Sequence, residues 1–262
     1  MAAAYPRTHG SGNRNRVASP LLGKVAGLLH GFTTRWAGDF SGPEAARGLQ
    51  DATGARALRL LRQVHGVRVE RVVPSRAGDE PGGGAPRSLR PQADAWAGNP
   101  GPEVLLGVLT ADCVPVLLCH PASRTLALAH AGWRGAVDGV SEAALEAMGV
   151  SAEETLAALG PAIGPCCYQV GKEVADAGGT DSPRFSPWAG EPGRYRLDLP
   201  GLVRDRLVAA GVPPGAVDVL PYCTACRADL FYSHRRGADL GRMCAYLGWA
   251  PERGEGWEGG RT

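Results

Sequence analysis

The sequence predicts an α+β fold with mixed sheets. Three short apolar runs rich in Val and Leu follow one another at residues 104–109, 114–119 and 125–130, and they are too short for most helices. A helical pattern follows them, in which Ala, Leu, Val and Glu recur at three- and four-residue spacing. Because the three strands precede the helix and do not alternate with helices, their order favours α+β over a strictly alternating α/β fold.

The remaining elements follow from the same kinds of pattern. An alternating run at residues 67–73 predicts a further strand. Helical spacing predicts helices at residues 135–148, 153–159 and 199–210. Irregular composition, rich in Gly and Pro, predicts loops or frayed ends at residues 74–91, 177–194 and from residue 251 onward.

The composition fits a globular protein with a small-molecule site. The chain has 262 residues, 44% apolar and 21% charged, which can bury a full core in one large domain or two tightly merged halves. The formal net charge of +2 is too balanced to favour nucleic acid or a membrane surface as a partner. No apolar stretch approaches the roughly 20 residues that a membrane span needs. We therefore expect a cytoplasmic protein that binds small molecules.

The two ends of the chain differ in composition from the rest. Residues 1–20 combine Arg, Gly and Ser and lack the apolar core of a secretory signal, which predicts a disordered leader. Residues 251–262 are rich in Gly and Glu, which predicts a flexible tail. We expect residues 21–250 to form a single catalytic domain.

The seven cysteines indicate thiols or metal ligands, because their number is odd and their spacing is not that of a disulfide framework. Cys223 and Cys226 have the spacing of half a zinc ribbon or of a redox pair. No second such pair exists, so we predict a packing role for them. Cys166 and Cys167 are adjacent and point opposite ways in an extended chain, so at most one faces a pocket, and a structural role is favoured over that of a nucleophile.

A hairpin is predicted over residues 113–130, with turn residues at 120–123 between two apolar arms. Pairing Cys119 with Arg124 would place Cys113 directly opposite His130. Cross-strand neighbours have Cβ atoms about 4.5–5.5 Å apart, a separation at which a thiolate and an imidazole can bind one metal ion. A slip of one residue would put the two side chains on opposite faces.

Polar and flexible residues flank this pair. Asp112 follows a buried apolar strand, where a carboxylate is costly unless it has a partner or a catalytic task. After His130, Gly132 and Gly135 free the backbone, Trp133 offers a stacking face and Arg134 offers a guanidinium for an anionic oxygen. The N-terminal amides of the helix that begins there could add to anion binding.

His65 is the candidate for a third ligand, at the start of the alternating run at residues 67–73. Taken alone, a His at such a position is more often a structural residue. A catalytic zinc, however, commonly takes three protein ligands and keeps one position for water. His30, His120 and His234 compete for the role, and these residues alone leave the choice open.

Seven motifs occur in the order found in one known family. They are His30–Arg35, Arg62–Gly66, Ala93–Trp96, Leu109–Leu117, Ala129–Gly135, Gly160–Tyr168 and Phe231–Arg242. On these motifs the chain resembles the bacterial laccase-domain proteins, also described as multicopper polyphenol oxidoreductase-like proteins, peptidoglycan editing factors or zinc-dependent purine nucleoside phosphorylases. Seven linked motifs are far more specific than any one of them.

The resemblance implies a four-layer α/β/β/α arrangement and one zinc ion bound by His65, Cys113 and His130. It also implies phosphorolysis of adenosine, inosine, guanosine and methylthioadenosine, with adenosine deaminase activity in addition. The expected partners are a nucleoside and phosphate. Where the family usually has Gly-Gly-Val-Ser and Ser-Leu-Asn, this chain has Trp36–Gly42 and a shortened link, so no substrate contact is assigned to that missing Asn.

The expected chemistry assigns further roles to the residues around the metal. Asp112 is the nearest candidate, by sequence, to carry a proton for a zinc-activated water during deamination. Arg134 is expected to hold phosphate as a catalytic residue. We predict substrate contacts for Trp133 and for Arg62 or Arg235.

Other functions stay open. Polyphenol oxidation with copper in place of zinc is one, but multicopper sites need many His residues and His-x-His triplets, whereas this chain has six His and no such triplet. Amide hydrolysis of a peptidoglycan precursor is another, and a non-catalytic partner with a structural zinc is a third. A structural zinc would usually show four Cys or His ligands. The preferred nucleoside, the physiological role and the oligomeric state are not predicted.

Overall fold

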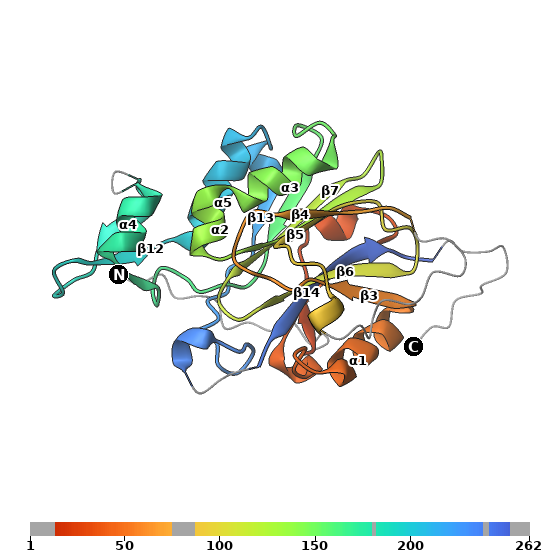
Figure 1. The fold of residues 1–262 in the computed structure, drawn as a ribbon, viewed down its shortest axis with the longest axis horizontal. Coiled ribbons are helices and arrows are strands. Elements are labelled where there is room, and N and C mark those ends of the chain that lie inside the picture. The colour runs from red at the N-terminus through yellow and green to blue at the C-terminus, as the bar shows by residue number, and fades with distance from the viewer. Residues whose placement is uncertain (1–13, 75–86, 180–181, 238–240, 252–262) are drawn as a thin grey trace.

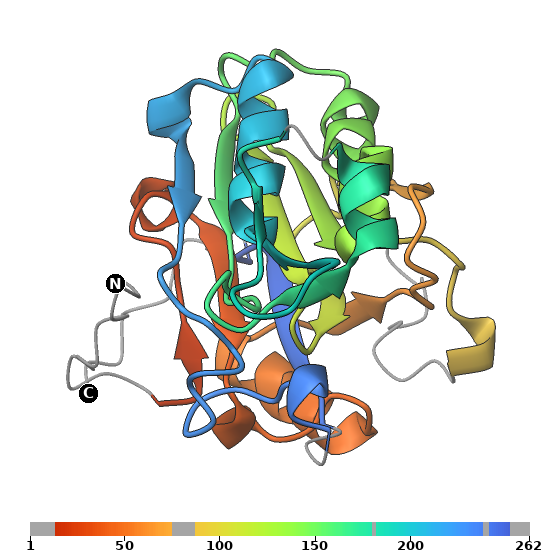
Figure 2. The ribbon, with the colours of Figure 1, turned by 90° about the vertical axis from the view of Figure 1, so that its left-hand side faces the viewer.

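Two β-sheets stacked face to face form the centre of the protein, with helices on both outer sides (Figure 1). The computed structural model describes residues 14–74, 87–179, 182–237 and 241–251. In Figure 1, α2, α3 and α5 lie above the sheets and α1 lies below them. Figure 2 shows the same stack turned by 90°, with green and blue helices above and the orange helix below. The order of layers is therefore α/β/β/α, as expected.

The five-stranded sheet has the order β1-β2-β14-β6-β3. Its strands are β1 (Arg16–Val17), β2 (Leu28–Thr33), β14 (Met243–Trp249), β6 (Val104–Thr110) and β3 (Ala57–Leu60). The pairing of β3 with β6 is parallel, and the other pairings are antiparallel. The sheet is thus mixed, as the order of elements predicts.

The six-stranded sheet has the order β13-β9-β7-β8-β5-β4. Its strands are β13 (Val217–Val219), β9 (Leu156–Leu159), β7 (Val114–His120), β8 (Thr125–Ala131), β5 (Ala95–Gly98) and β4 (Val69–Val72). This sheet is also mixed, because its two outermost pairings are parallel and the inner ones antiparallel. A separate three-stranded antiparallel sheet contains β10 (Gln169–Gly171), β12 (Arg194–Leu197) and β11 (Phe185–Pro187).

The helices bury their apolar sides against the outer faces of the sheets. The α-helices are α1 (Pro43–Thr53), α2 (Trp133–Asp138), α3 (Val140–Met148), α4 (Lys172–Gly178) and α5 (Leu199–Ala209). Short 3₁₀ turns are η1 (Leu22–Lys24), η2 (Arg35–Ala37), η4 (Arg87–Leu89), η5 (Pro214–Ala216) and η6 (His234–Arg236). None of the helices in the described ranges is long and apolar enough to cross a membrane.

Alternation along the strands divides the core into layers. On β7, Val116 and Leu118 face the helices, whereas Leu117 and Cys119 face the other sheet. On β14, Leu247 lies between the sheets and Tyr246 packs toward α1. The central strands of the two stacked sheets are therefore apolar on both faces, which explains why they appear in the sequence as continuous apolar runs.

Two of the predicted helices differ from the structure. Residues 153–159 do not form a helix, because Leu156–Leu159 is strand β9, paired with β7 inside the sheet. A short apolar run buried on both faces has no periodicity that separates strand from helix. The helix predicted at residues 135–148 is two helices, α2 and α3, divided at Gly139, whose φ of 94° no helix accommodates. The helix at residues 199–210 is confirmed as α5.

The segments expected to be irregular also contain structure. Residues 177–194 include strand β11, which pairs with β12. The predicted leader is wrong over residues 14–20, because β1 pairs with β2 and Ser19 is buried. Residues 1–13, most of the loop predicted at 74–91, and residues 252–262 of the tail lie outside the described ranges.

The predicted hairpin forms, but with a different register. Strand β7 ends at His120, β8 begins at Thr125, and these two residues pair, so Cys119 lies opposite Leu126 and not Arg124. His130 consequently pairs with Pro115, two residues beyond the predicted partner Cys113. A shift of two residues keeps the side chains on the same face, because strand alternation has a period of two.

Candidate functional site

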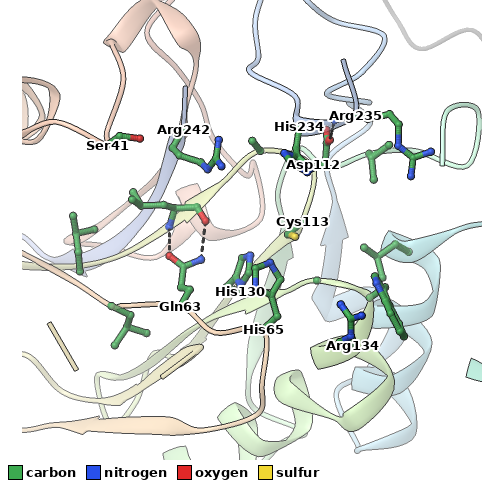
Figure 3. Close-up of a pocket in the computed structure, with 18 of the residues that line it drawn as sticks. Ser41, Gln63, His65, Asp112, Cys113, His130, Arg134, His234, Arg235 and Arg242 are labelled. Atoms are coloured by element: carbon green, nitrogen blue, oxygen red, sulfur yellow. Dashed lines mark hydrogen bonds between the residues drawn. The ribbon is translucent and has the colours of Figure 1, made fainter. Parts of the chain in front are cut away.

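Three side chains from three segments converge at one end of the sheets. The ligand atoms of His65, Cys113 and His130 all lie within 4.8 Å of one another. The two imidazole rings meet edge to face, with centroids 4.9 Å apart and planes inclined by 78°. Figure 3 shows the thiol of Cys113 pointing toward both rings. The structure thus brings the three predicted metal ligands together.

Each ligand is held where an element begins or ends. Cys113 directly precedes β7, in the connection that leaves β6 of the other sheet. His130 lies near the end of β8 and is buried. His65 follows β3 in a loop and has a φ of 63°, a left-handed conformation that is uncommon for a residue with a side chain. The competing His30 and His120 bond elsewhere, to Ser19 and to Ser123.

A buried carboxylate joins two of the ligand segments. Asp94 is fully buried and accepts hydrogen bonds from the backbone N–H groups of Val64, His65 and Gly66 at 2.8–3.2 Å. Its Oδ1 also lies 3.1 Å from Nδ1 of His130. When Nδ1–H donates to a carboxylate, the other ring nitrogen keeps its lone pair for a metal. Sequence reasoning placed Asp94 in a motif but gave it no role.

The electrostatics of the site favour the ligating form of the thiol. Burial acts to raise the pKa of Cys113, but charge and hydrogen bonds from His130 and His65 outweigh it and lower the pKa to about 6. Burial acts to lower the pKa of His130, but Cys113 and Asp94 raise it to about 9. Metals bind the thiolate, so this surrounding suits a metal ligand.

Gly132 leaves room beside the three ligands. A Cβ atom at this position would lie 3.2 Å from Sγ of Cys113 and 3.0 Å from Cδ2 of His65. A side chain there would crowd both ligands. One thiolate and two imidazoles are a donor set that zinc accepts, and three protein ligands leave one position for a substrate or water. The residues present therefore fit a catalytic metal ion.

The ligands open into a cavity of about 810 Å³. Its described lining residues include four arginines, which are Arg90, Arg134, Arg235 and Arg242. Among the same described residues, Asp112 carries the one carboxylate. The cavity is therefore suited to an anionic ligand.

The carboxylate of Asp112 is engaged in holding loops. Oδ1 accepts a hydrogen bond from Thr224 Oγ1 at 2.6 Å, and Oδ2 accepts from Ser233 Oγ at 3.1 Å and from the N–H of Arg235 at 2.7 Å. Asp112 also has a φ of 93°. Through these hydrogen bonds, Asp112 holds the segments of Thr224, Ser233 and Arg235 in place at the cavity wall.

The remaining predicted site residues divide into two groups. Trp133 and Arg134 line the cavity, with the guanidinium 4.3 Å from the ring centroid. Arg235 also lines it and lies 5.1 Å from the ring centroid of Tyr168. The structure does not bring Arg62 to the cavity, because this residue is exposed and donates to Gln92.

Several lining residues were missed from the sequence. Gln63 bonds in both directions to the backbone of Leu109 at 2.8 Å, which ties the segment of His65 to the end of β6 (Figure 3). His234 was considered only as a competing ligand, although it lines the cavity. Arg242 and Ser41 lie across the cavity from Arg134 (Figure 3). Gln63 and Arg242 lie inside recognised motifs, which is where they could have been sought.

Comparison with known proteins identifies relatives in sequence. The family described as multi-copper polyphenol oxidoreductase laccase matches residues 42–250. A purine nucleoside phosphorylase of Pseudomonas aeruginosa is 42% identical over 191 residues, which cover 71% of this chain and 72% of the relative. The purine nucleoside phosphorylase YlmD of Geobacillus stearothermophilus is 35% identical over 260 residues, which cover 88% of this chain and 92% of the relative.

Two solved structures share the fold. The crystal structure of YlmD from Geobacillus stearothermophilus has a TM-score of 0.75 and 31% identity, and the match covers 88% of this chain and 94% of that chain. The crystal structure of the hypothetical protein YfiH of Bacillus licheniformis has a TM-score of 0.76 and 29% identity, covering 85% and 92%. With its family match and these relatives, the chain belongs to the multi-copper polyphenol oxidoreductase laccase family.

Proposed function

We propose that the protein is a zinc-dependent purine nucleoside phosphorylase with adenosine deaminase activity in addition. The observation that carries this proposal is the position of His65, Cys113 and His130 at the base of a cavity whose described lining is rich in arginine. Relatives that cover most of this chain bear the name purine nucleoside phosphorylase. The expected substrates are adenosine, inosine, guanosine and methylthioadenosine.

Zinc is the metal we propose, as one ion held by these three residues. When bound, it supplies Lewis acidity close to the reacting atoms. Asp94 fixes the ring of His130 and the backbone of His65, so the ligands are held in place by contacts that do not involve the metal. Such contacts tune metal affinity in known sites.

Phosphorolysis needs a phosphate beside C1′ of the ribose. In the reaction, the bond from C1′ to the purine nitrogen breaks, and a bond from C1′ to a phosphate oxygen forms. The guanidinium groups of Arg134 and Arg235 would hold the phosphate, and the rings of Trp133 and Tyr168 offer faces for the base. Asp112 would position the N–H of Arg235 and could exchange a proton with the substrate.

Copper is the competing metal. Two imidazoles and one thiolate also occur in mononuclear copper sites, where a Met is the usual weak fourth ligand. Met148 and Met243 are buried in apolar clusters and are absent from the described cavity lining. Oxidation of phenols by several copper ions would need more imidazoles than the six in this sequence supply. We therefore favour zinc.

One experiment separates these functions. Protein with defined zinc or copper content is incubated with adenosine with and without phosphate, and in parallel with a phenolic dye. We expect zinc-dependent release of adenine and ribose 1-phosphate only when phosphate is present, and some inosine and ammonia in its absence. Copper-dependent oxidation of the dye without nucleoside cleavage would contradict the proposal.

The ligand assignment has its own test. Replacing His130 with Ala should remove the metal from the cavity and abolish phosphorolysis.

The role of Arg134 in phosphate binding is tested separately. Arg134→Gln should raise the KM for phosphate. Arg194→Ala, which changes an exposed arginine on β12 outside the cavity lining, should leave that KM unchanged. An unchanged KM in Arg134→Gln would remove this arginine from phosphate binding.

A further inference from the structure

Four cysteines that the proposed reaction does not use meet at a second place. The Sγ atoms of Cys166, Cys167, Cys223 and Cys226 all lie within 4.8 Å of one another. The thiol of Cys226 lies 3.5 Å from that of Cys166 and 3.4 Å from that of Cys167. These separations are far longer than the S–S bond of a disulfide, about 2.05 Å. All four are free thiols in the structure.

The spacing matches four sulfur atoms around one ion. In a tetrahedral zinc site with Zn–S bonds of about 2.3 Å, neighbouring sulfurs are about 3.8 Å apart. The Sγ–Sγ separations of 3.4 and 3.5 Å, and the 4.8 Å within which all four sulfurs lie, bracket that value. Small shifts of the side chains would therefore complete a tetrahedron.

The fold fixes the two segments that carry these cysteines. The parallel pairing of β9 and β13 continues beyond both strands as a bridge between Ala162 and Cys223. The N–H of Thr224 donates to the carbonyl of Ala162 at 2.9 Å, and the N–H of Gly164 donates to Sγ of Cys223 at 3.2 Å. Backbone N–H groups that donate to sulfur stabilise a thiolate.

The two adjacent cysteines can share one ion because their chain is not extended. The N–H groups of Cys167 and Tyr168 both donate to the carbonyl of Gly164 at 3.0 Å, which makes a turn. Alternation of side chains applies to extended chain only, so the expectation that Cys166 and Cys167 point apart fails in this turn. The packing role predicted for Cys223 and Cys226 rested on finding no second pair of cysteines with that spacing. The structure supplies a second pair, Cys166 and Cys167, from another loop.

We propose that Cys166, Cys167, Cys223 and Cys226 bind one zinc ion, separate from the ion at His65, Cys113 and His130. Four thiolates fill the coordination of zinc and leave no position for a substrate, so this ion is structural. The position of this ion in the fold indicates what it stabilises. Thr224 donates to Asp112 and Tyr168 lines the cavity, so the ion ties together two loops that form one wall of the cavity.

Metal analysis of the full-length protein tests this. Wild type and variants are prepared under reducing conditions, supplied with zinc chloride and desalted, and zinc per chain is measured by mass spectrometry. We expect Cys223→Ser/Cys226→Ser to hold one zinc ion fewer than wild type. Cys119→Ala, which removes a buried thiol outside both clusters, should match wild type. His130→Ala should lose metal from the cavity only, so the two sites are distinguished.

A single substitution tests the same site in case the double variant does not fold. Cys226 is exposed, so Cys226→Ser should fold. Cobalt bound to His130→Ala protein should give the strong sulfur-to-metal absorption of four thiolates, and adding Cys226→Ser should weaken it. Loss of the ion should also make the segment around residues 223–235 more sensitive to protease. Equal zinc in wild type and the double variant, or disulfides among the four cysteines in the reduced preparation, would overturn the proposal.

Discussion

Asp94 connects two ligand segments that lie far apart in the sequence. Its carboxylate accepts from three successive backbone N–H groups around His65 and from the ring of His130, and no part of it reaches solvent. Burial acts to raise the pKa of Asp94, but the hydrogen bonds of His130 and of the backbone lower it. The carboxylate is thus charged in the folded protein, and it orients the ring of His130 and holds the backbone of His65.

Replacing Asp94 with Asn tests this role while keeping the size of the side chain. One oxygen becomes an NH₂ group, which faces N–H donors and leaves at least one of them without an acceptor. We expect about 1–3 kcal/mol of lost stability and a roughly 10–100-fold lower metal affinity at His65, Cys113 and His130. Urea unfolding and competition with a chelator measure the two effects. Asp138→Asn, at an exposed carboxylate on α2, is the control and should change neither. Wild-type metal affinity in Asp94→Asn would show that Asp94 does not position the ligands.

Gly132 is required for space and not for its backbone angles, because its φ is −71°. Gly132→Ala would bring a methyl group against Cys113 and His65. We expect weaker metal binding and loss of activity, with the circular dichroism spectrum unchanged. Gly215→Ala is the matched control, since a Cβ there meets nothing within 4 Å. Full metal occupancy in Gly132→Ala would mean that the ligands move aside freely.

At the scale of elements, the hairpin of β7 and β8 shows what the sequence can specify. The apolar alternation predicted which residues share a face, and that part is confirmed for Cys113 and His130. The predicted turn length of four residues is correct, but the turn lies at residues 121–124 and not at 120–123. This displacement by one residue along both strands changes the register by two, and the apolar pattern does not fix where the turn begins. A shift by an even number of residues leaves each side chain on its predicted face, so Cys113 and His130 still lie close together, as predicted.

Other features of the fold and the site depend on contacts between residues far apart in the sequence, which a local sequence pattern does not predict. Strand β9 was mistaken for a helix, since its burial on both faces comes from the sheet and from α5 and not from its own spacing. The partners of Asp94 lie 28–30 residues before it and 36 residues after it, and the four-cysteine cluster joins loops 59–60 residues apart. The linked motifs predicted the fold and the three ligands, whereas the contacts that support them required the structure.

The junction of α5 with the three-stranded sheet depends on ion pairs of Arg184. Its guanidinium bonds to Asp198, which caps α5, and to Asp205, about two turns farther along the helix, at 2.7–2.8 Å. The hydrogen bond from Arg184 lowers the pKa of Asp205 below its ordinary value of 3.8, against the opposing effect of burial. A carboxylate whose pKa is lower in the folded state adds stability above its unfolded pKa and loses it as the pH falls through the folded pKa.

Arg184→Ala should therefore be less stable than wild type at neutral pH, by about 1 kcal/mol given the partial exposure of these pairs. The difference should shrink below pH 4, as Asp205 becomes protonated in wild type. Urea unfolding from pH 7 to pH 3 measures it, and Arg194→Ala serves as the exposed control. A difference that does not vary with pH would assign the loss to packing of the Arg184 stem and not to its charge.

At the scale of the whole molecule, the cavity lies where the chain passes from one sheet to the other. Strand β6 ends in the five-stranded sheet, residues 111–113 cross over, and β7 begins in the six-stranded sheet. Asp112 and Cys113 are part of this crossing, and Gln63 fixes its start by bonding to Leu109. The relative position of the ligands therefore depends on how the two sheets stack.

Leu117 tests that dependence, because it is fully buried between the sheets and is not among the described residues that line the cavity. Leu117→Ala should cost about 2–5 kcal/mol of stability through the cavity it leaves. Leu89→Ala, at a side chain that is 74% exposed, should cost little. If the sheets hold the ligands, metal release from Leu117→Ala during a urea titration should shift to lower urea together with the loss of β-sheet circular dichroism. Release that stays at the wild-type urea concentration, while the sheets unfold earlier, would show that the ligand loops keep their geometry without the stacked sheets.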